Sequence, residues 1–434
     1  MNISRNSRIR TRDNLAVVIL AAGQGKRMRS DIPKVLHKVC GREIIGYVLC
    51  LALSLRPKQV IVVLGRGREQ IMPWIRRGYP DKKVTFVTQH RLLGTADAIA
   101  RARPRIKGRV SDVLVLYGDQ PLLRKATLRQ LLRLHYRQSA ACTLFSAQMP
   151  SPQGYGRIIR DEQKGVSCIR EDKDLNGKEK GINEVNAGSC IFRRKDLFAV
   201  LDKIRPNNKK GEYYLTDAIS LLRLQGKKIA CQRTDCYEEA LGVNSRADLA
   251  EAENVLRKRI VHGLMRQGVT ISGPETTFID WDVRVGRDSV IMPFVYIGRG
   301  ARIGRNCRIG PFCHIRGGSV IKDNAQIGSF AEINRSIVGE KTRIKHFSYL
   351  GDARLGKEVN IGAGTVTANF DGRNKNKTCI KDKAFIGSDT VLVAPLKVGR
   401  GAVTGAGCVI TKNNDVPDNG VVWGVPARQK TKKG

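Results

Sequence analysis

Short apolar runs alternate with helix-like segments in the first half of the chain, and the spacing between Glu43 and Leu55 predicts one such helix. Apolar runs separated by helices are typical of a parallel sheet that is covered on both faces. The clearest runs are AVVIL at 16–20, VIVVL at 60–64, VTFV at 84–87 and DVLVLYGD at 112–119. Ligands of such sheets bind beyond the carboxyl ends of the strands, so the loops after Leu20 and Tyr117 are candidate binding loops.

The second half has a different rhythm, in which an aliphatic residue returns every six positions. The unbroken series is Val285, Ile291, Ile297, Ile303, Ile309, Ile315, Ile321, Ile327 and Ile333. The repeat resumes out of phase at Val338, Ile344, Leu350, Leu355 and Ile361, and again at Ile386, Leu392, Val398, Thr404 and Ile410. A period of six fits neither a helix nor an alternating strand. It indicates a hexapeptide β-helix, in which each aliphatic side chain points inward and three hexads form one triangular coil.

Two further segments organise the chain. Residues 245–267 predict a single long helix between the two halves, which Asn244 or Ser245 could cap and which Gly268 would end. Residues 367–383, TANFDGRNKNKTCIKDK, break the six-residue repeat and are expected to leave the wall of the β-helix. Such a loop is either functional or a simple surface insertion.

Charge narrows the choice of partners. The 434 residues contain 78 Lys and Arg against 39 Asp and Glu, a net charge of +39. This surplus favours anionic partners such as nucleotides, sugar phosphates, coenzyme A or RNA. The cations are scattered rather than gathered into one tract, which suits a generally basic surface better than a DNA groove.

Cysteine usage and hydropathy bear on the compartment. None of the eleven cysteines forms a C-x-x-C pair, and the closest pairs, Cys231 with Cys236 and Cys307 with Cys313, do not have a zinc-site spacing. We therefore expect free, mostly buried thiols. The arginine-rich start lacks the apolar core of a secretory signal, and the apolar runs are too short to span a membrane. These features predict a cytoplasmic protein.

The loop LAAGQGKRMRSDIPKVL at 20–36 has the ingredients of a phosphate site. Its glycines let backbone N–H groups approach an anion, and Lys26, Arg27 and Lys34 supply positive charge. It lacks the spacing of a P-loop, and Met28 stands where the dinucleotide fingerprint needs its third glycine. The alternative is a tight strand-to-helix turn with solvated cations.

A family resemblance extends from residue 15 to about residue 412. The motifs that carry it occur in this order: LAAGQGKRM, Pro33-Lys34, QHRLLGTADA, LYGDQPL, GYGRI, EDKD, NAGSCIF, GEYYLTD, GVNSR, HFSYLGD and NIGAGTVTANFDG. The chain resembles the bacterial bifunctional N-acetylglucosamine-1-phosphate uridylyltransferase and glucosamine-1-phosphate N-acetyltransferase. That resemblance implies an enzyme that acetylates glucosamine 1-phosphate with acetyl-coenzyme A and then transfers a uridylyl group from UTP, to give UDP-N-acetylglucosamine and pyrophosphate.

The resemblance also implies an α/β fold with a flexible basic leader at 1–14 and a Rossmann-like nucleotidyltransferase domain at 15–244. A linker helix at 245–268 and a left-handed parallel β-helix at 269–434, which ends in a short basic tail, would follow. In the family, β-helices of this kind assemble as homotrimers, and the acetyltransferase site is built from more than one chain.

For uridylyl transfer the resemblance implies a UTP site with a magnesium ion. Arg27 and Lys34 would contact the phosphates and be catalytic, while Asp119 and Asn244 would hold Mg²⁺, an ion that takes few protein oxygens. No protein nucleophile is needed, since positioning and charge neutralisation suffice. The residues that would contact UTP or the UDP-sugar are Leu20, Ala22, Gly23, Lys34, Gln89, Gly94, Thr95, Gly156, Glu171, Asn186 and Asn244.

For acetyl transfer the resemblance implies His346 as the base that takes a proton from the attacking amine. The sugar-phosphate pocket would consist of Arg316, Asn334, Tyr349, Asn360 and Lys375. Acetyl-coenzyme A would contact Ala363, Asn369, Phe370, Ser388 and Ala406.

The chain departs from the family pattern in four places. LLGTADA at 92–98 stands where QLGTGHA is usual, which bears on base selectivity. Asn334 replaces a phosphate-binding lysine, although Arg335 is adjacent, and a lost charge-assisted contact is worth about 1.5–3 kcal/mol. Phe370 replaces a tyrosine, and the tail WGVPARQKTKKG has no match to a late arginine.

Two other functions remain open on the sequence. The first is a sugar-phosphate uridylyl- or thymidylyltransferase whose β-helix is only a trimerising scaffold. The second is a basic RNA-binding protein, which the absence of an RNA-binding motif and of interleaved aromatic residues disfavours.

Overall fold

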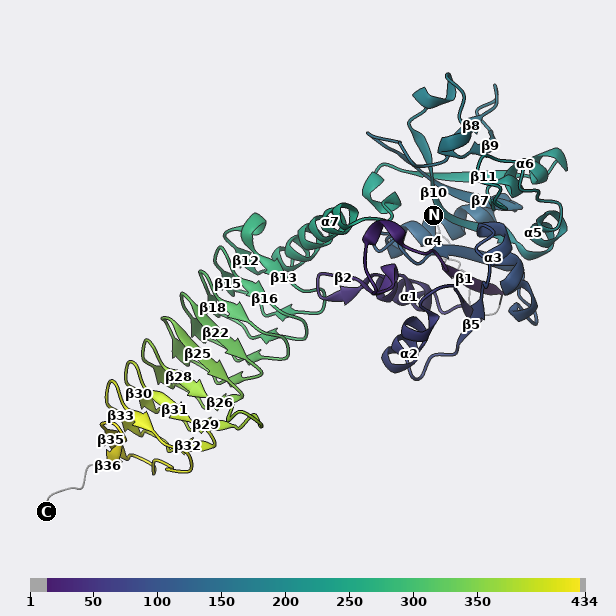
Figure 1. The fold of residues 1–434 in the computed structure, drawn as a ribbon. Coiled ribbons are helices and arrows are strands. Elements are labelled where there is room, and N and C mark those ends of the chain that lie inside the picture. Colours follow the sequence, from purple (N-terminus) through teal and green to yellow (C-terminus); the bar gives the residue numbers. More distant parts are fainter. Residues whose placement is uncertain (1–13, 430–434) are drawn as a thin grey trace, which may run out of the picture. The chain divides into compact units, whose positions relative to one another are not determined.

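The computed structural model describes residues 14–429 (Figure 1). These residues form two compact units, the first ending at Glu253 and the second beginning at Asn254. The predicted basic leader, apart from Asn14, and the last five residues lie outside the described part of the chain.

The first unit is built on a mixed sheet with the strand order β11-β7-β10-β6-β1-β4-β5. Its strands are β1 (Leu15–Ala21), β4 (Gln59–Leu64), β5 (Val84–Thr88), β6 (Asp112–Tyr117), β7 (Cys142–Gln148), β10 (Glu184–Arg193) and β11 (Ile229–Thr234). A hairpin of β8 (Arg157–Arg160) and β9 (Val166–Arg170) extends from β10, and β2 (Lys38–Val39) pairs with β3 (Arg42–Glu43). The four predicted apolar runs form β1, β4, β5 and β6, and these strands are parallel.

The sheet predicted from the four parallel runs also contains a strand of opposite direction, since β10 is antiparallel to both β6 and β7. The chain leaves β7, forms the β8–β9 hairpin and enters β10 without a crossover helix. A strand that re-enters a sheet from the end at which the chain left it must run antiparallel to its predecessor. An apolar run does not encode this direction.

Helices cover both faces of this sheet, as predicted (Figure 1). Val17 and Ile19 pack with Leu49 of α1 in one core, while Ala16 and Val18 pack with residues of α3 in the other. All of these strand residues are fully buried. The helices are α1 (Ile44–Ser54), α2 (Arg68–Gly78), α3 (Thr95–Ala102), α4 (Lys125–Gln138), α5 (Arg194–Leu201) and α6 (Asp217–Leu224).

The helix expected between the halves is α7 (Arg246–Met265), and the boundary between the two compact units falls within it. Ser245 caps it, because the Asp248 N–H donates to Ser245 Oγ while Asp248 Oδ2 accepts from the Ser245 N–H. This reciprocal arrangement satisfies two N–H groups that the helix leaves free. Gly268 follows the helix at φ +88°, a left-handed conformation that favours glycine.

The second unit is a parallel β-helix with three sheet faces (Figure 1). The first face consists of β12 (Thr270–Ile271), β15 (Val290–Ile291), β18 (Arg308–Ile309), β21 (Gln326–Ile327), β24 (Arg343–Ile344), β27 (Asn360–Ile361), β30 (Phe385–Ile386), β33 (Val403–Thr404), β35 (Val421–Trp423) and the antiparallel β36 (Arg428–Gln429). The second face consists of β13 (Phe278–Ile279), β16 (Tyr296–Ile297), β19 (His314–Ile315), β22 (Ala331–Asn334), β25 (Ser348–Gly351), β28 (Val366–Ala368), β31 (Val391–Val393) and β34 (Val409–Ile410). The third face consists of β14 (Arg284–Val285), β17 (Arg302–Ile303), β20 (Val320–Ile321), β23 (Ile337–Val338), β26 (Ala353–Leu355), β29 (Thr378–Ile380) and β32 (Leu396–Val398).

The predicted inward positions of the repeat are confirmed, since every one of them is at most 8% exposed. The predicted interruption at 367–383 is too long, because Thr367 lies in β28 and Ile380 in β29, both facing inward and buried. Thr367 escaped the repeat because it is polar. Its hydroxyl oxygen accepts a hydrogen bond from the Gly351 N–H at 2.7 Å, which removes the penalty of burying it. The segment that leaves the wall is therefore residues 369–377.

The cysteines in the described residues are all free, and six of the eleven are buried while Cys50 is exposed. Within residues 14–429 no helix has both the length and the apolar character that a membrane span requires.

Candidate active sites

A cleft of about 630 Å³ lies in the first unit, beyond the carboxyl ends of β1 and β6. It brings together residues that are far apart in the sequence but that share a predicted contact with the nucleotide sugar. The predicted residues that line it are Leu20, Ala22, Gly23, Lys34, Gln89, Gly94, Thr95, Asp119, Gly156, Glu171, Asn186 and Asn244. Arg27 does not line the cleft. It lies in the 3₁₀ helix Lys26–Met28 with its side chain exposed.

The glycine-rich loop forms one wall of this cleft. A Cβ placed on Gly23 would meet nothing within 4 Å, so the backbone there is open to a ligand. Gly25 has φ +64°, and a Cβ on it would lie 2.8 Å from the Lys34 Cβ. Glycine is therefore needed at position 25 for its left-handed conformation and for its close contact with Lys34.

Lys34 connects the two residues that are predicted to hold a metal ion. Its Nζ donates to Asp119 Oδ2 at 2.5 Å and to Asn244 Oδ1 at 2.9 Å. The Lys34 side chain is 9% exposed and that of Asp119 22%. Asn244 is fixed by the start of α7, where its backbone N–H donates to Asp248 Oδ2.

These two oxygens fit a magnesium ion. One carboxylate oxygen and one amide oxygen, brought in from different loops, already converge on a single cationic atom. Mg²⁺ prefers hard oxygen ligands and needs only one or two from the protein when substrate phosphates supply the others. The described residues contain no group of three or more His, Cys, Asp or Glu side chains that could form an all-protein metal cage.

The predicted base-recognition residues form a rigid unit at another wall. The buried Gln89 donates through Nε2 to the Gly94 carbonyl at 2.9 Å and to Asp97 Oδ2 at 2.8 Å. Thr95 Oγ1 accepts from the Leu215 N–H at 2.9 Å. Asp97 belongs to the stretch that departs from the family pattern, and here it holds the Gln89 amide in place.

Acidic residues gather at the predicted sugar end. Burial raises the pKa of Glu171, and Asp217 and Asp174 add to the effect, while the Thr216 hydroxyl donates to its Oε1 at 3.0 Å. The nearby Lys210 ammonium opposes the rise and lines the cleft. Lys210 was not among the predicted site residues, although it stands directly before the motif GEYYLTD.

Replacing Asp217 with asparagine is expected to stabilise the protein above pH 6. Burial, with a contribution from Asp174, raises the pKa of Asp217 from 3.8 to about 6. An acid whose pKa is raised by folding stabilises the fold less as the pH rises through this window, because ionisation is harder in the folded state. After a discount for its partial exposure, we expect a gain of about 1–2 kcal/mol.

Chemical denaturation at pH 4 and pH 8 measures this effect. The asparagine variant should match the wild type at pH 4 and exceed it at pH 8. The exposed Asp81, replaced in the same way, should show no such difference. An equal gain at both pH values would show that the carboxylate charge is not the cause.

A second group of predicted residues lies along one edge of the β-helix, in the turns between the first and second faces, which we call the first edge. His346, Ala363, Ser388 and Ala406 occupy this edge in successive coils. Backbone hydrogen bonds stack the turns: Gly364 N–H to the Phe347 carbonyl, Asp389 N–H to the Ala363 carbonyl and Gly407 N–H to the Ser388 carbonyl, at 2.6–2.8 Å. Ala363 is half-buried, and the other three residues are exposed.

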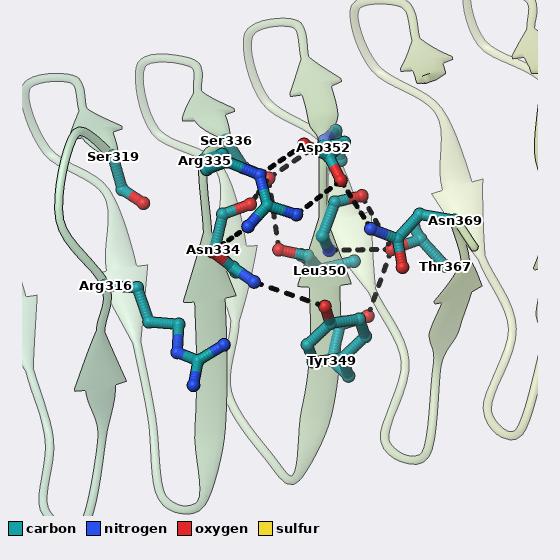
Figure 2. A network of polar contacts seen from close by, with 12 residues as sticks. Arg316, Ser319, Asn334, Arg335, Ser336, Tyr349, Leu350, Asp352, Thr367 and Asn369 are labelled. Carbon is teal, nitrogen blue, oxygen red and sulfur yellow. Dashed lines mark hydrogen bonds and ion pairs between the residues drawn. The ribbon is translucent and has the colours of Figure 1, made fainter. Parts of the chain in front are cut away.

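The second face carries two of the predicted sugar-phosphate residues, Asn334 in β22 and Tyr349 in β25, and a polar network fixes Asn334 (Figure 2). The buried Asn334 donates through Nδ2 to the Tyr349 hydroxyl at 3.4 Å and accepts at Oδ1 from Arg335 at 3.0 Å. Arg335 in turn forms two hydrogen bonds of 2.7 Å to the Asp352 carboxylate. This guanidinium holds the pKa of Asp352 below its usual range. Arg335, the neighbour of the position where the family has a lysine, is thus paired with Asp352.

The remaining predicted residues are not gathered at one place in a single chain. Asn369 and Phe370 lie at the opposite, second edge, between the second and third faces, where Asn369 also donates to Asp352. The two edges are far apart within one chain. Thr365 at the first edge and Asn369 at the second, which flank β28, are separated by about 13 Å at 3.3 Å per residue. Lys375 projects on the segment 369–377, paired with Phe370, and Asn360 lies on the first face. Glu332 and Asp352 were not among the predicted residues. The Glu332 carboxylate pairs with Arg316 at 3.2 Å.

Known proteins resemble both units. Residues 17–206 match the model of the MobA-like NTP transferase domain, and residues 274–370 match the GMPPB C-terminal domain. Three relatives bear the name bifunctional protein GlmU. That of Syntrophomonas wolfei is 40% identical over 93% of this chain and 96% of its own. That of Desulfitobacterium hafniense is 42% identical over 93% and 94%, and that of Listeria monocytogenes serotype 4a is 39% identical over 93% and 94%. A solved UDP-glucose pyrophosphorylase complexed with UDP-glucose aligns with a TM-score of 0.48 at 19% identity, over 57% of this chain and 99% of its own.

Proposed function

The chain belongs to the family of the bifunctional protein GlmU, and from this premise we propose how its residues divide two reactions between them. The protein is a bifunctional transferase that makes UDP-N-acetylglucosamine. It transfers an acetyl group from acetyl-coenzyme A to the amine of glucosamine 1-phosphate. It also transfers a uridylyl group from UTP to N-acetylglucosamine 1-phosphate, with release of pyrophosphate.

Uridylyl transfer takes place in the cleft of the first unit. Its volume of about 630 Å³ suits a nucleotide sugar. Gln89, held by Asp97, orients the uracil, and Glu171 and Asn186 orient the sugar so that its phosphate oxygen is in line with the α-phosphorus of UTP. Such transfer needs positioning and charge stabilisation rather than a protein nucleophile.

Charge in this cleft comes from three sources. When bound, Mg²⁺ held by Asp119 and Asn244 neutralises phosphate charge as a Lewis acid. Lys34 supplies an ammonium at the same wall, and the open backbone at Gly23 supplies N–H donors. Arg27, outside the cleft, approaches the phosphates that extend past the loop. The convergence of Lys34, Asp119 and Asn244 is the observation that carries this assignment.

Acetyl transfer takes place on the β-helix. His346 accepts the proton that the amine nitrogen loses as it attacks the thioester carbon, and coenzyme A leaves as the thiol. The stacked turns with Ala363, Ser388 and Ala406 present backbone groups to the coenzyme. Arg316 and Lys375 hold the sugar phosphate, and Asn334 supplies a neutral donor.

A homotrimer completes this second site. Of the 17 exposed large hydrophobic side chains in residues 14–429, 14 lie in residues 254–429, as expected for a unit that associates through its flat faces. Packing of β-helices side by side brings the second edge of one copy, with Asn369 and Phe370, toward the first edge of another. The trimer would carry a charge of 3 × 39, or +117, which apolar burial and counterions must offset.

A coupled assay tests the function as a whole. The full chain is supplied with glucosamine 1-phosphate, acetyl-coenzyme A, UTP and Mg²⁺, and free thiol, pyrophosphate and UDP-N-acetylglucosamine are measured. We expect all three products. Pyrophosphate release only when N-acetylglucosamine 1-phosphate is supplied would favour the scaffold alternative. No turnover, together with RNA binding that weakens steeply with salt, would favour the RNA-binding alternative.

A further inference from the structure

Lys34 has two roles in the cleft that exclude each other. Its ammonium now lies on Asp119 Oδ2 and Asn244 Oδ1, the two oxygens assigned to the metal ion. The same ammonium is assigned to the phosphates of UTP. A single Nζ atom cannot remain on both oxygens while they bind a divalent cation.

The distances would place the two cations close together. A magnesium ion lies about 2.0–2.1 Å from its oxygen ligands, so on Asp119 Oδ2 it would be at most roughly 4.6 Å from an ammonium that is 2.5 Å from the same oxygen. The two charges of Mg²⁺ and the one of the ammonium would then repel each other. The Lys34 side chain is only 9% exposed there, so water screens this repulsion poorly. Binding of one cation therefore expels the other.

The side chain is built to move at its outer end only. Lys34 Cβ is packed against Gly25, where a Cβ would come within 2.8 Å of it. The bonds beyond Cβ are rotatable in any lysine, and through them Nζ would move from the two oxygens toward the open backbone of Gly23. In this movement Gly25 of the glycine-rich loop holds the base of the Lys34 side chain, and the ammonium reaches the phosphates beside Gly23.

We propose that Lys34 is the resident cation of the free enzyme. It holds Asp119 and Asn244 in the geometry of metal ligands and keeps a divalent ion out until nucleotide phosphates draw the ammonium away. The metal accordingly enters with the nucleotide, and empty enzyme does not collect metal from solution. This inference deepens the proposed uridylyl transfer and rests on the assignment of Asp119 and Asn244 as metal ligands.

Binding of Mn²⁺ to the full chain without nucleotide, followed by electron paramagnetic resonance, tests the proposal. Lys34→Met keeps the length of the side chain and removes its charge, so we expect it to bind Mn²⁺ at least about tenfold more tightly than the wild type. The gain should vanish in the double variant Lys34→Met with Asp119→Ala. Lys38→Met, which neutralises an exposed lysine four residues further along the chain, should bind like the wild type.

Two further variants keep the test decisive. Lys34→Arg retains a cation and should stay as weak a metal binder as the wild type, and Lys34→Gln replaces the methionine variant if that one does not fold. Equal Mn²⁺ affinity in the wild type and in the neutral variants overturns the proposal. So does micromolar binding by the wild type that Asp119→Ala abolishes. Because the readout needs no turnover, failure of uridylyl transfer with an intact gain in affinity would refute the proposed function alone.

Discussion

Replacing Asp119 with alanine is expected to lower uridylyl transfer by at least about 100-fold while acetyl transfer stays within about twofold of the wild-type rate. Asp119 contributes the carboxylate that pairs with the Lys34 ammonium and that is proposed to hold the metal ion. Its loss removes a ligand and leaves Lys34 without its charged partner. Transition-state charge stabilisation by a metal is worth several kcal/mol, and each 1.36 kcal/mol is a factor of about ten in rate.

Acetyl transfer should persist because every residue assigned to it lies in the second unit, whereas Asp119 lies in the first. The two half-reactions are measured separately on the same preparation, pyrophosphate release for the first and thiol release for the second. Asp119→Asn keeps the shape and an oxygen ligand, so it should fall between the wild type and the alanine variant. The exposed Asp31, replaced by alanine, serves as control for removal of an acid from the neighbouring loop. Equal loss of both activities in a folded protein would contradict the assignment of separate sites.

Local sequence patterns predicted most of the fold. The six-residue repeat predicted the inward positions of the β-helix because each hexad repeats the same backbone and the same need to bury one aliphatic side chain. Thr367 shows the limit of this pattern. A buried hydroxyl that finds a partner, here the Gly351 N–H, can occupy an aliphatic position without any trace in the apolar spacing.

The direction of a strand and the contacts between residues distant in the sequence could not be predicted from local patterns. The run NAGSCIF reads as a buried strand whichever way it points, and only the β8–β9 hairpin before it makes β10 antiparallel. Lys34 lies 85 residues from Asp119 and 210 from Asn244, so their contact follows from the family resemblance and not from spacing. Asp352 and Glu332 look like ordinary surface acids in the sequence, and only the stacking of coils reveals that they hold Arg335 and Arg316.

Acetyl transfer on the β-helix should depend on His346, as uridylyl transfer in the first unit should depend on Asp119. His346→Ala is expected to lower kcat of acetyl transfer by about 100- to 10,000-fold, the usual contribution of a general base. KM for both substrates should change little, because the contacts assigned to the sugar phosphate and to the coenzyme come from other side chains and from the stacked turns. Uridylyl transfer should be unaffected.

The position of His346 also suggests how to separate chemistry from folding. The side chain is exposed at the first edge of the single chain, so its removal leaves no buried cavity within the β-helix, and added imidazole should restore part of the lost rate. His314→Ala provides the matched control, since His314 is an imidazole of the same unit that packs edge-on against Tyr296 at 5.1 Å on the second face. That variant should keep most of its acetyl transfer. A His346→Ala protein that retains more than a tenth of the wild-type kcat, or that imidazole does not rescue, would mean that another group takes the proton from the amine.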